Sequence, residues 1–123
     1  MTLFSGAPAD PPRNDFITRN AADAQAVMVG WWPGDPRHPG AAFFAYAHPA
    51  PAGFARASLS PAGARWDEGL GEYLLDWDEV RADADPRAAA VEFARSVFRH
   101  ACAVCEWDAD LAATAEGWPP PVR

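Results

Sequence analysis

The sequence contains no lysine. All 10 of its basic residues are arginines, and they face 17 acidic residues, which leaves a formal net charge of −7. A field of this sign repels nucleic-acid backbones, and no stretch of the chain gathers its arginines into a basic stripe. We therefore predict that the protein does not bind nucleic acid through its overall charge.

Long apolar runs are missing as well. The longest are far shorter than the roughly 20 residues that a membrane span needs, and residues 1–5 lack the basic region and apolar run of a signal peptide. The chain also has no glycine-rich phosphate loop and no Ser-His-Asp order. We therefore predict a cytoplasmic protein with no membrane contact, no cofactor and no metal site.

What the sequence does contain is typical of one globular domain. Half of its 123 residues are apolar, and a chain of this length buries roughly two-thirds of the surface that its unfolded form exposes. The 13 prolines and 9 glycines cluster in segments that read as loops. There are no internal repeats, so we predict a single domain over residues 1–123.

The clearest predicted element is a long amphipathic helix over about residues 86–105. Asp85 is a good N-cap, and a proline at the first helical position loses no hydrogen bond. Apolar residues then recur at the helical period and form a wide stripe, which includes Val91, Ala94, Phe98, Ala101 and Cys105. This stripe must pack against a sheet.

Four segments have the composition of strands: residues 2–5, 41–48, 63–66 and 72–75. The last two are expected to form a hairpin, and both faces of residues 41–48 are mainly apolar, so we expect cover on both sides of that strand. A short helix is expected at about residues 21–29, capped by Asn20. The predicted fold class is α+β, a small antiparallel sheet of three or four strands packed by the long helix.

Several runs of residues, in the same order, resemble a known bacterial family. They include Phe43-Phe44-Ala45-Tyr46-Ala47-His48-Pro49, Trp66-Asp67-Glu68-Gly69-Leu70-Gly71-Glu72-Tyr73 and Glu106-Trp107-Asp108. The chain is similar to the C-terminal part of domain-of-unknown-function family 5996, a resemblance that implies a fold but brings no established activity. It departs from the family where Thr18-Arg19-Asn20 replaces a Ser-His-Glu-like run and where His48 replaces a tyrosine.

Cys102 and Cys105 form a C-x-x-C pair near the end of the predicted helix. Redox pairs of this kind place the first cysteine at a helix N-terminus, where the dipole lowers the thiol pKa. A zinc site would need further cysteines or paired histidines. We predict two reduced thiols, with Cys105 buried and Cys102 only partly buried.

A group of aromatic and polar residues suggests a small-molecule site, because apolar walls with few polar groups are typical of ligand pockets. The predicted walls and anchors are Trp31, Trp32, Phe44, Arg19 and Asp35. His48 is predicted as the general acid or base and Tyr46 as a hydrogen-bond donor. The predicted function is small-molecule binding, and a cofactor-independent isomerase, cyclase or hydrolase is the enzymatic form of it.

A non-catalytic interaction module is the alternative. A chain that corresponds to part of a longer family member exposes apolar surface, which a second copy or a partner chain must cover. One of the adjacent Trp31 and Trp32 is expected on such a surface, because neighbouring residues of an extended chain point to opposite sides. Light scattering across a dilution series distinguishes the two functions.

Overall fold

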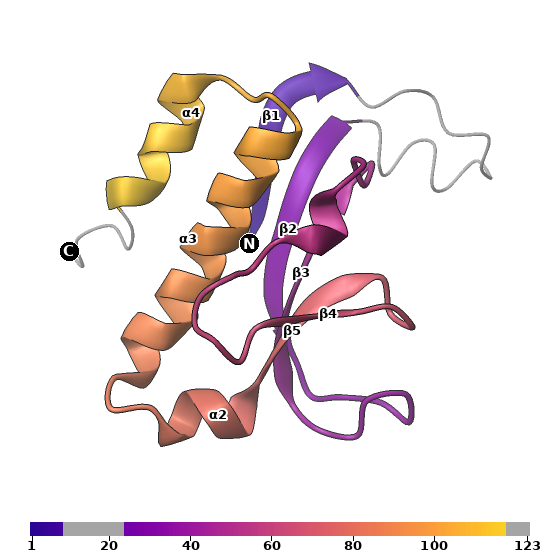
Figure 1. The fold of residues 1–123 in the computed structure, drawn as a ribbon, viewed down its shortest axis with the longest axis vertical. Coiled ribbons are helices and arrows are strands. Elements are labelled where there is room, and N and C mark those ends of the chain that lie inside the picture. The colour runs from indigo at the N-terminus through magenta and orange to yellow at the C-terminus, as the bar shows by residue number, and fades with distance from the viewer. Residues whose placement is uncertain (9–23, 118–123) are drawn as a thin grey trace.

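The computed structural model describes residues 1–8 and 24–117. Five strands form one antiparallel sheet in the order β1-β2-β3-β5-β4 (Figure 1). They are β1 (Thr2–Pro8), β2 (Ala24–Trp32), β3 (Ala42–His48), β4 (Arg65–Asp67) and β5 (Glu72–Asp76). The predicted α+β class is confirmed, but the sheet has five strands in place of three or four.

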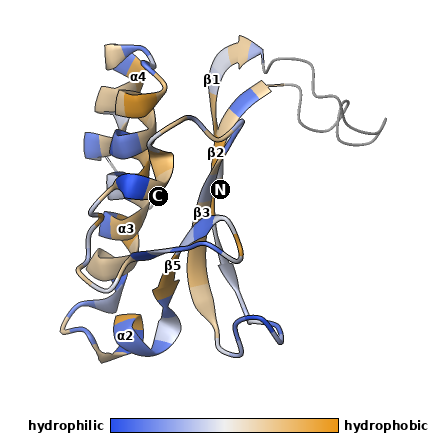
Figure 2. Cartoon of the chain, turned by 45° about the vertical axis from the view of Figure 1, so that its right-hand side comes forward, coloured by the Kyte–Doolittle hydropathy of each residue, from blue (hydrophilic) through white to orange (hydrophobic). Residues whose placement is uncertain are grey.

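Helices lie on one face of this sheet (Figures 1 and 2). They are α2 (Trp77–Ala82), α3 (Pro86–Val104) and α4 (Ala109–Ala113), with short 3-10 turns η1 (Phe54–Arg56) and η2 (Thr114–Gly117). The start of α3 is as predicted, because Asp85 Oδ1 accepts a hydrogen bond of 3.0 Å from the backbone N–H of Ala88. No helix in the described ranges is long and apolar enough to cross a membrane.

The predicted short helix at residues 21–29 is wrong. Residues 24–32 form β2, which pairs with β1 on one side and β3 on the other, and residues 21–23 lie outside the described ranges. Val27 and Val29 are both buried toward α3, which is the period-two pattern of a strand. The alanines of this segment favour a helix locally, but pairing along both edges and burial of the valines outweigh that propensity.

The main core lies between the sheet and α3. The sheet contributes Val27, Ala45 and Tyr73, and α3 contributes Phe93 and Val97, all of them almost inaccessible to solvent. Burying a valine or phenylalanine side chain stabilises a fold by roughly 1.5–3 kcal/mol. α3 packs on the sheet as predicted, but its buried stripe is centred on Phe93 and Val97. Of the residues predicted for the stripe, Phe98 and Ala101 are buried, whereas Val91, Ala94 and Cys105 are partly exposed.

The predicted burial of the two cysteines is reversed. Cys102 is buried, in a second cluster with Phe98 and Ala115, whereas Cys105 is partly exposed; both thiols are free. The reason is that α4 and η2 fold back and cover the Cys102 side of α3. Cys105 lies just after the last residue of α3, where the chain leaves the helix.

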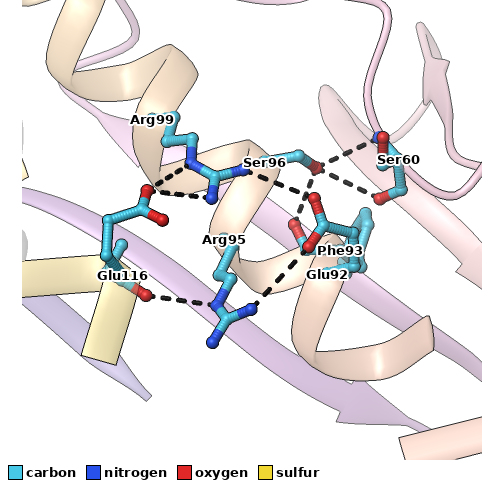
Figure 3. A network of polar contacts seen from close by, with 8 residues as sticks. Ser60, Glu92, Phe93, Arg95, Ser96, Arg99 and Glu116 are labelled. Atoms are coloured by element: carbon cyan, nitrogen blue, oxygen red, sulfur yellow. Dashed lines mark hydrogen bonds and ion pairs between the residues drawn. The ribbon is translucent and has the colours of Figure 1, made fainter. Parts of the chain in front are cut away.

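A polar network fastens η2 to the outer side of α3 (Figure 3). Arg95 Nε donates to the carbonyl oxygen of Ala115 (3.1 Å), and Arg99 Nη2 lies 2.9 Å from Glu116 Oε1. Near the other end of the network, Ser96 Oγ donates to the carbonyl oxygen of Ser60 (3.1 Å). These contacts add to the apolar packing of Ala115 against Phe98 and Cys102.

The sheet face turned away from α3, here called the open face, carries none of the described helices (Figure 2). On β3 it presents Phe44, Tyr46 and His48, all of which are partly exposed. Helices therefore cover β3 on one side only, in contrast to the two-sided cover expected from its sequence.

Candidate functional site

Three predicted site residues lie in a row on the open face. Phe44, Tyr46 and His48 alternate along β3, and the stacked rings of Phe44 and Tyr46 have centroids 6.1 Å apart. The Tyr46 hydroxyl donates to the sulfur of Met28 on β2. Arg19, the predicted anion anchor, lies outside the described residues.

The predicted tryptophans are not beside His48. Trp32 pairs with Ala42 at one end of the β2–β3 ladder, whereas His48 pairs with Ala26 at the other end. This offset corresponds to about 20 Å at roughly 3.3 Å per residue, so one small ligand does not reach both side chains. Trp31 points to the opposite face from Trp32, as alternation requires, and is 51% exposed.

The structure brings Trp32 to a different histidine, His38, which sequence reasoning missed. The two rings stack with centroids 5.7 Å apart and an interplanar angle of 28°. His38 Nε2 lies 2.9 Å from Asp76 Oδ1, and Arg65 Nη1 lies 3.0 Å from Asp76 Oδ2. The His38 side chain is only 15% exposed, so this end of the open face holds an ordered histidine–carboxylate pair.

A tight loop between β2 and β3 presents His38. The backbones of Asp35 and His38 exchange hydrogen bonds of 3.1 and 3.0 Å, and hydrogen bonds from Arg37 hold the pKa of the Asp35 carboxyl below its usual value. Gly34 has a φ of 97°, and a Cβ added there would lie 2.6 Å from the carbonyl oxygen of Gly40. Asp35, which was predicted to bind a ligand, therefore stabilises the loop and pairs with Arg37.

His38 and Asp76 form part of the wall of a cleft of about 500 Å³. One wall is the end of the β2–β3 loop and the other is the junction of β5 and α2; together they contribute His38, Pro39, Gly40, Ala41, Asp76, Trp77, Asp78 and Glu79. A hydrogen bond of 2.9 Å from the backbone N–H of Trp77 to the carbonyl oxygen of Ala41 joins the two walls. The cleft is thus built by segments far apart in the sequence.

Two of the three carboxylates that line this cleft are paired with other side chains. Asp76 bonds His38 and Arg65, and Asp78 Oδ1 lies 2.7 Å from Arg81 Nε. Glu79 lies so close to Gly63 that a Cβ added there would be 1.7 Å from its Oε2. Within the described ranges, no three histidine, cysteine or acidic side chains are placed to hold a metal ion.

The histidine on the α3 side of the sheet is a packing residue. His100 stacks on Phe54 with centroids 5.4 Å apart, and its Nε2 is 2.8 Å from the Phe54 carbonyl oxygen. The Tyr73 hydroxyl donates to the same carbonyl. Because these groups satisfy one another inside the core, this cluster is not a candidate site.

One local signal pointed to the site, but it was not sufficient. His38 stands in Pro36-Arg37-His38-Pro39-Gly40, a rigid loop that fixes a side chain. Its partner Asp76 is one of several acidic residues in this part of the sequence. Only the β3–β5 register, in which Ala42 is opposite Asp76, brings the two together.

Comparison with known proteins supports the resemblance seen in the sequence. The model of a family of unknown function, DUF5996, matches residues 1–114, a range that includes Trp32, His38, Arg65 and Asp76. No curated protein and no solved structure matches the chain. By this match over nearly its whole length, the chain belongs to the family of unknown function DUF5996.

Proposed function

We propose that the protein binds a small molecule in the cleft beside His38 and transfers a proton to or from it without a cofactor. The observation that carries this proposal is the 2.9 Å contact between His38 Nε2 and Asp76 Oδ1 in the cleft wall. A cleft of about 500 Å³ falls within the roughly 300–1,000 Å³ of small-molecule sites. The acid–base role predicted for His48 thus moves to His38, where Trp32 and Asp35 also lie.

Each member of the pair has a separate task in this proposal. Asp76 accepts a hydrogen bond from Nε2–H of His38, and the lone pair of Nδ1 is then the proton acceptor. The carboxylate then stabilises the imidazolium that forms. Isomerisation, cyclisation and hydrolysis can all use such a group, so the reaction classes predicted from the sequence are retained.

A base-sensitive probe tests the proposal without knowledge of the substrate. The ring of 5-nitrobenzisoxazole opens when a positioned base removes one proton. We expect His38→Gln to slow this opening by roughly 10²-fold, and Asp76→Asn to give an intermediate rate. His48→Gln is the matched control, because it changes the same residue type on the same sheet face. Equal rates for the wild type and His38→Gln, or a loss confined to His48→Gln, would contradict the proposal.

A patch of aromatic side chains favours a second candidate function, that of an interaction module. Trp31 is 51% and Trp77 38% exposed. Phe43, directly opposite Trp31, has its ring centroid 6.2 Å from that of Trp77. Exposed aromatic groups of this kind are typical of interfaces, and we propose a second copy of the chain as the occupant.

Light scattering across a dilution series tests this second candidate. Trp31→Glu should convert a dimer into a monomer at concentrations where the wild type is dimeric. Phe4→Glu is the matched control, since Phe4 is 58% exposed but lies on the open face. A wild type that stays monomeric at every concentration rules the dimer out.

A further inference from the structure

The Asp76 carboxylate is shared between two side chains. Its Oδ1 lies 2.9 Å from His38 Nε2 and 3.4 Å from Arg65 Nη2, and its Oδ2 lies 3.0 Å from Arg65 Nη1. Arg65 is opposite Leu74 in the β4–β5 pair, so it rises from the same face as Asp76, at a diagonal position on the neighbouring strand. The guanidinium therefore holds both carboxylate oxygens in the orientation that receives His38.

We infer that Arg65 is a positioning residue for His38: it orients Asp76 and, by sharing the carboxylate charge, favours the neutral imidazole that accepts a proton. This inference rests on the proposed acid–base function of His38. An imidazolium at this position lies close to the positive charge of Arg65, which disfavours it. Without Arg65, the full charge of Asp76 would act on His38 and favour the charged ring.

Other charged groups near His38 lie in its own loop, in the β4–β5 hairpin and in α2. In the loop that carries His38, Arg37 pairs with Asp35 (2.6 Å). The charges of Asp67 and Glu72, in the β4–β5 hairpin, attract the Arg37 guanidinium. In α2, Asp78 pairs with Arg81 and Glu79 lies against Gly63. Trp32, which stacks on the ring, carries no charge. Among these groups, Asp76 is the carboxylate in direct contact with His38, and Arg65 is the cation that shares it.

If Arg65 had a purely structural role, its removal would destabilise the protein, but its position argues against such a role. Its side chain is 45% exposed, and β4 is a three-residue strand at the edge of the sheet. Exposed ion pairs contribute little to stability. Replacing Arg65 should therefore leave the stability of the protein nearly unchanged, but it should change the protonation of His38.

The test is an NMR titration of the His38 imidazole in the free protein, with its signal assigned by comparison with His38→Gln. In Arg65→Met we expect the midpoint of the His38 titration to move to higher pH by roughly one unit, with the melting temperature nearly unchanged. Arg65→Lys, which keeps the charge, should restore most of the wild-type midpoint. If Arg65→Met does not fold, Arg65→Gln removes the charge and keeps a hydrogen-bond donor.

A midpoint in Arg65→Met equal to that of the wild type would overturn the inference, as would a midpoint in Arg65→Lys equal to that in Arg65→Met. The titration needs no ligand, so the two proposals fail separately. A shifted midpoint in a protein that does not open nitrobenzisoxazole contradicts only the function. An active protein with an unshifted midpoint contradicts only the role of Arg65.

Discussion

At the scale of single residues, the two thiols of α3 differ in what surrounds them. Cys102 is 5% exposed and packs in the cluster of Phe98 and Ala115, and burial raises the pKa of its thiol to about 11. We expect Cys102→Ser to lower the free energy of unfolding by about 1–3 kcal/mol, because it places a hydroxyl in an apolar cluster. Urea denaturation measures this difference. Cys105→Ser is the control and should cost less; an equal or larger cost would contradict the packing described.

Gly34 is the residue on which the loop of His38 most depends. Its φ of 97° is unfavourable for other residues, and an added Cβ would meet backbone atoms of His38 and Gly40 at 2.6–2.8 Å. Gly34→Ala should therefore destabilise the protein by roughly 1–3 kcal/mol and shift the His38 NMR signals. Gly40→Ala is the matched control, since no atom lies within 4 Å of its added Cβ. Similar effects of both changes would show that the loop backbone is not what holds His38.

At the scale of elements, a few polar contacts support the docking of η2 on α3 beside the buried Ala115 (Figure 3). Arg95 satisfies the backbone carbonyl of Ala115 and is 24% exposed, whereas the Arg99–Glu116 pair is largely exposed. We expect Arg95→Met to cost about 0.5–1.5 kcal/mol and to speed amide hydrogen exchange in residues 109–117. Glu116→Gln should cost less, because exposed ion pairs contribute little. Faster exchange across the whole sheet in Arg95→Met would instead indicate global unfolding.

At the scale of the whole molecule, Glu72 makes stability depend on pH. Burial raises the pKa of its carboxyl, with Arg37 acting in the opposite direction. A pKa raised in the folded state means that the protonated form stabilises folding, and this contribution is lost as pH rises through the folded pKa. As the pH rises from about 4 to neutral, the free energy of unfolding of Glu72→Gln should therefore increase relative to that of the wild type. Urea denaturation at a series of pH values measures this difference.

The exposed Glu68 of the same hairpin provides the control for this pH dependence. Glu68→Gln removes the same charge from the same turn region, but its carboxylate is exposed whereas that of Glu72 is partly buried. The difference in stability between Glu68→Gln and the wild type should change much less over the same pH range. A stability of Glu72→Gln that falls relative to the wild type as pH rises would show that Arg37 outweighs burial.

The sequence by itself determined the elements whose signals are local. Asp85 caps α3 through an amide only three residues away, and Pro86 follows at the first helical position. The turn of the β4–β5 hairpin closes through Asp67, whose carbonyl oxygen accepts from the backbone N–H of Gly71 at 2.8 Å. Contacts of this kind lie within a few residues, so composition and spacing are enough to predict them.

Only the tertiary structure decided the contacts made between distant segments. The alanine-rich segment of β2 became a strand because β1 and β3 pair with it, and Cys102 is buried because α4 and η2 return to α3. The candidate site has the same origin: His38, Arg65 and Asp76 come from a loop and two strands, and they meet through the β3–β5 and β4–β5 registers. Since a register of strands depends on the burial of a whole face, no single segment of the sequence contains it.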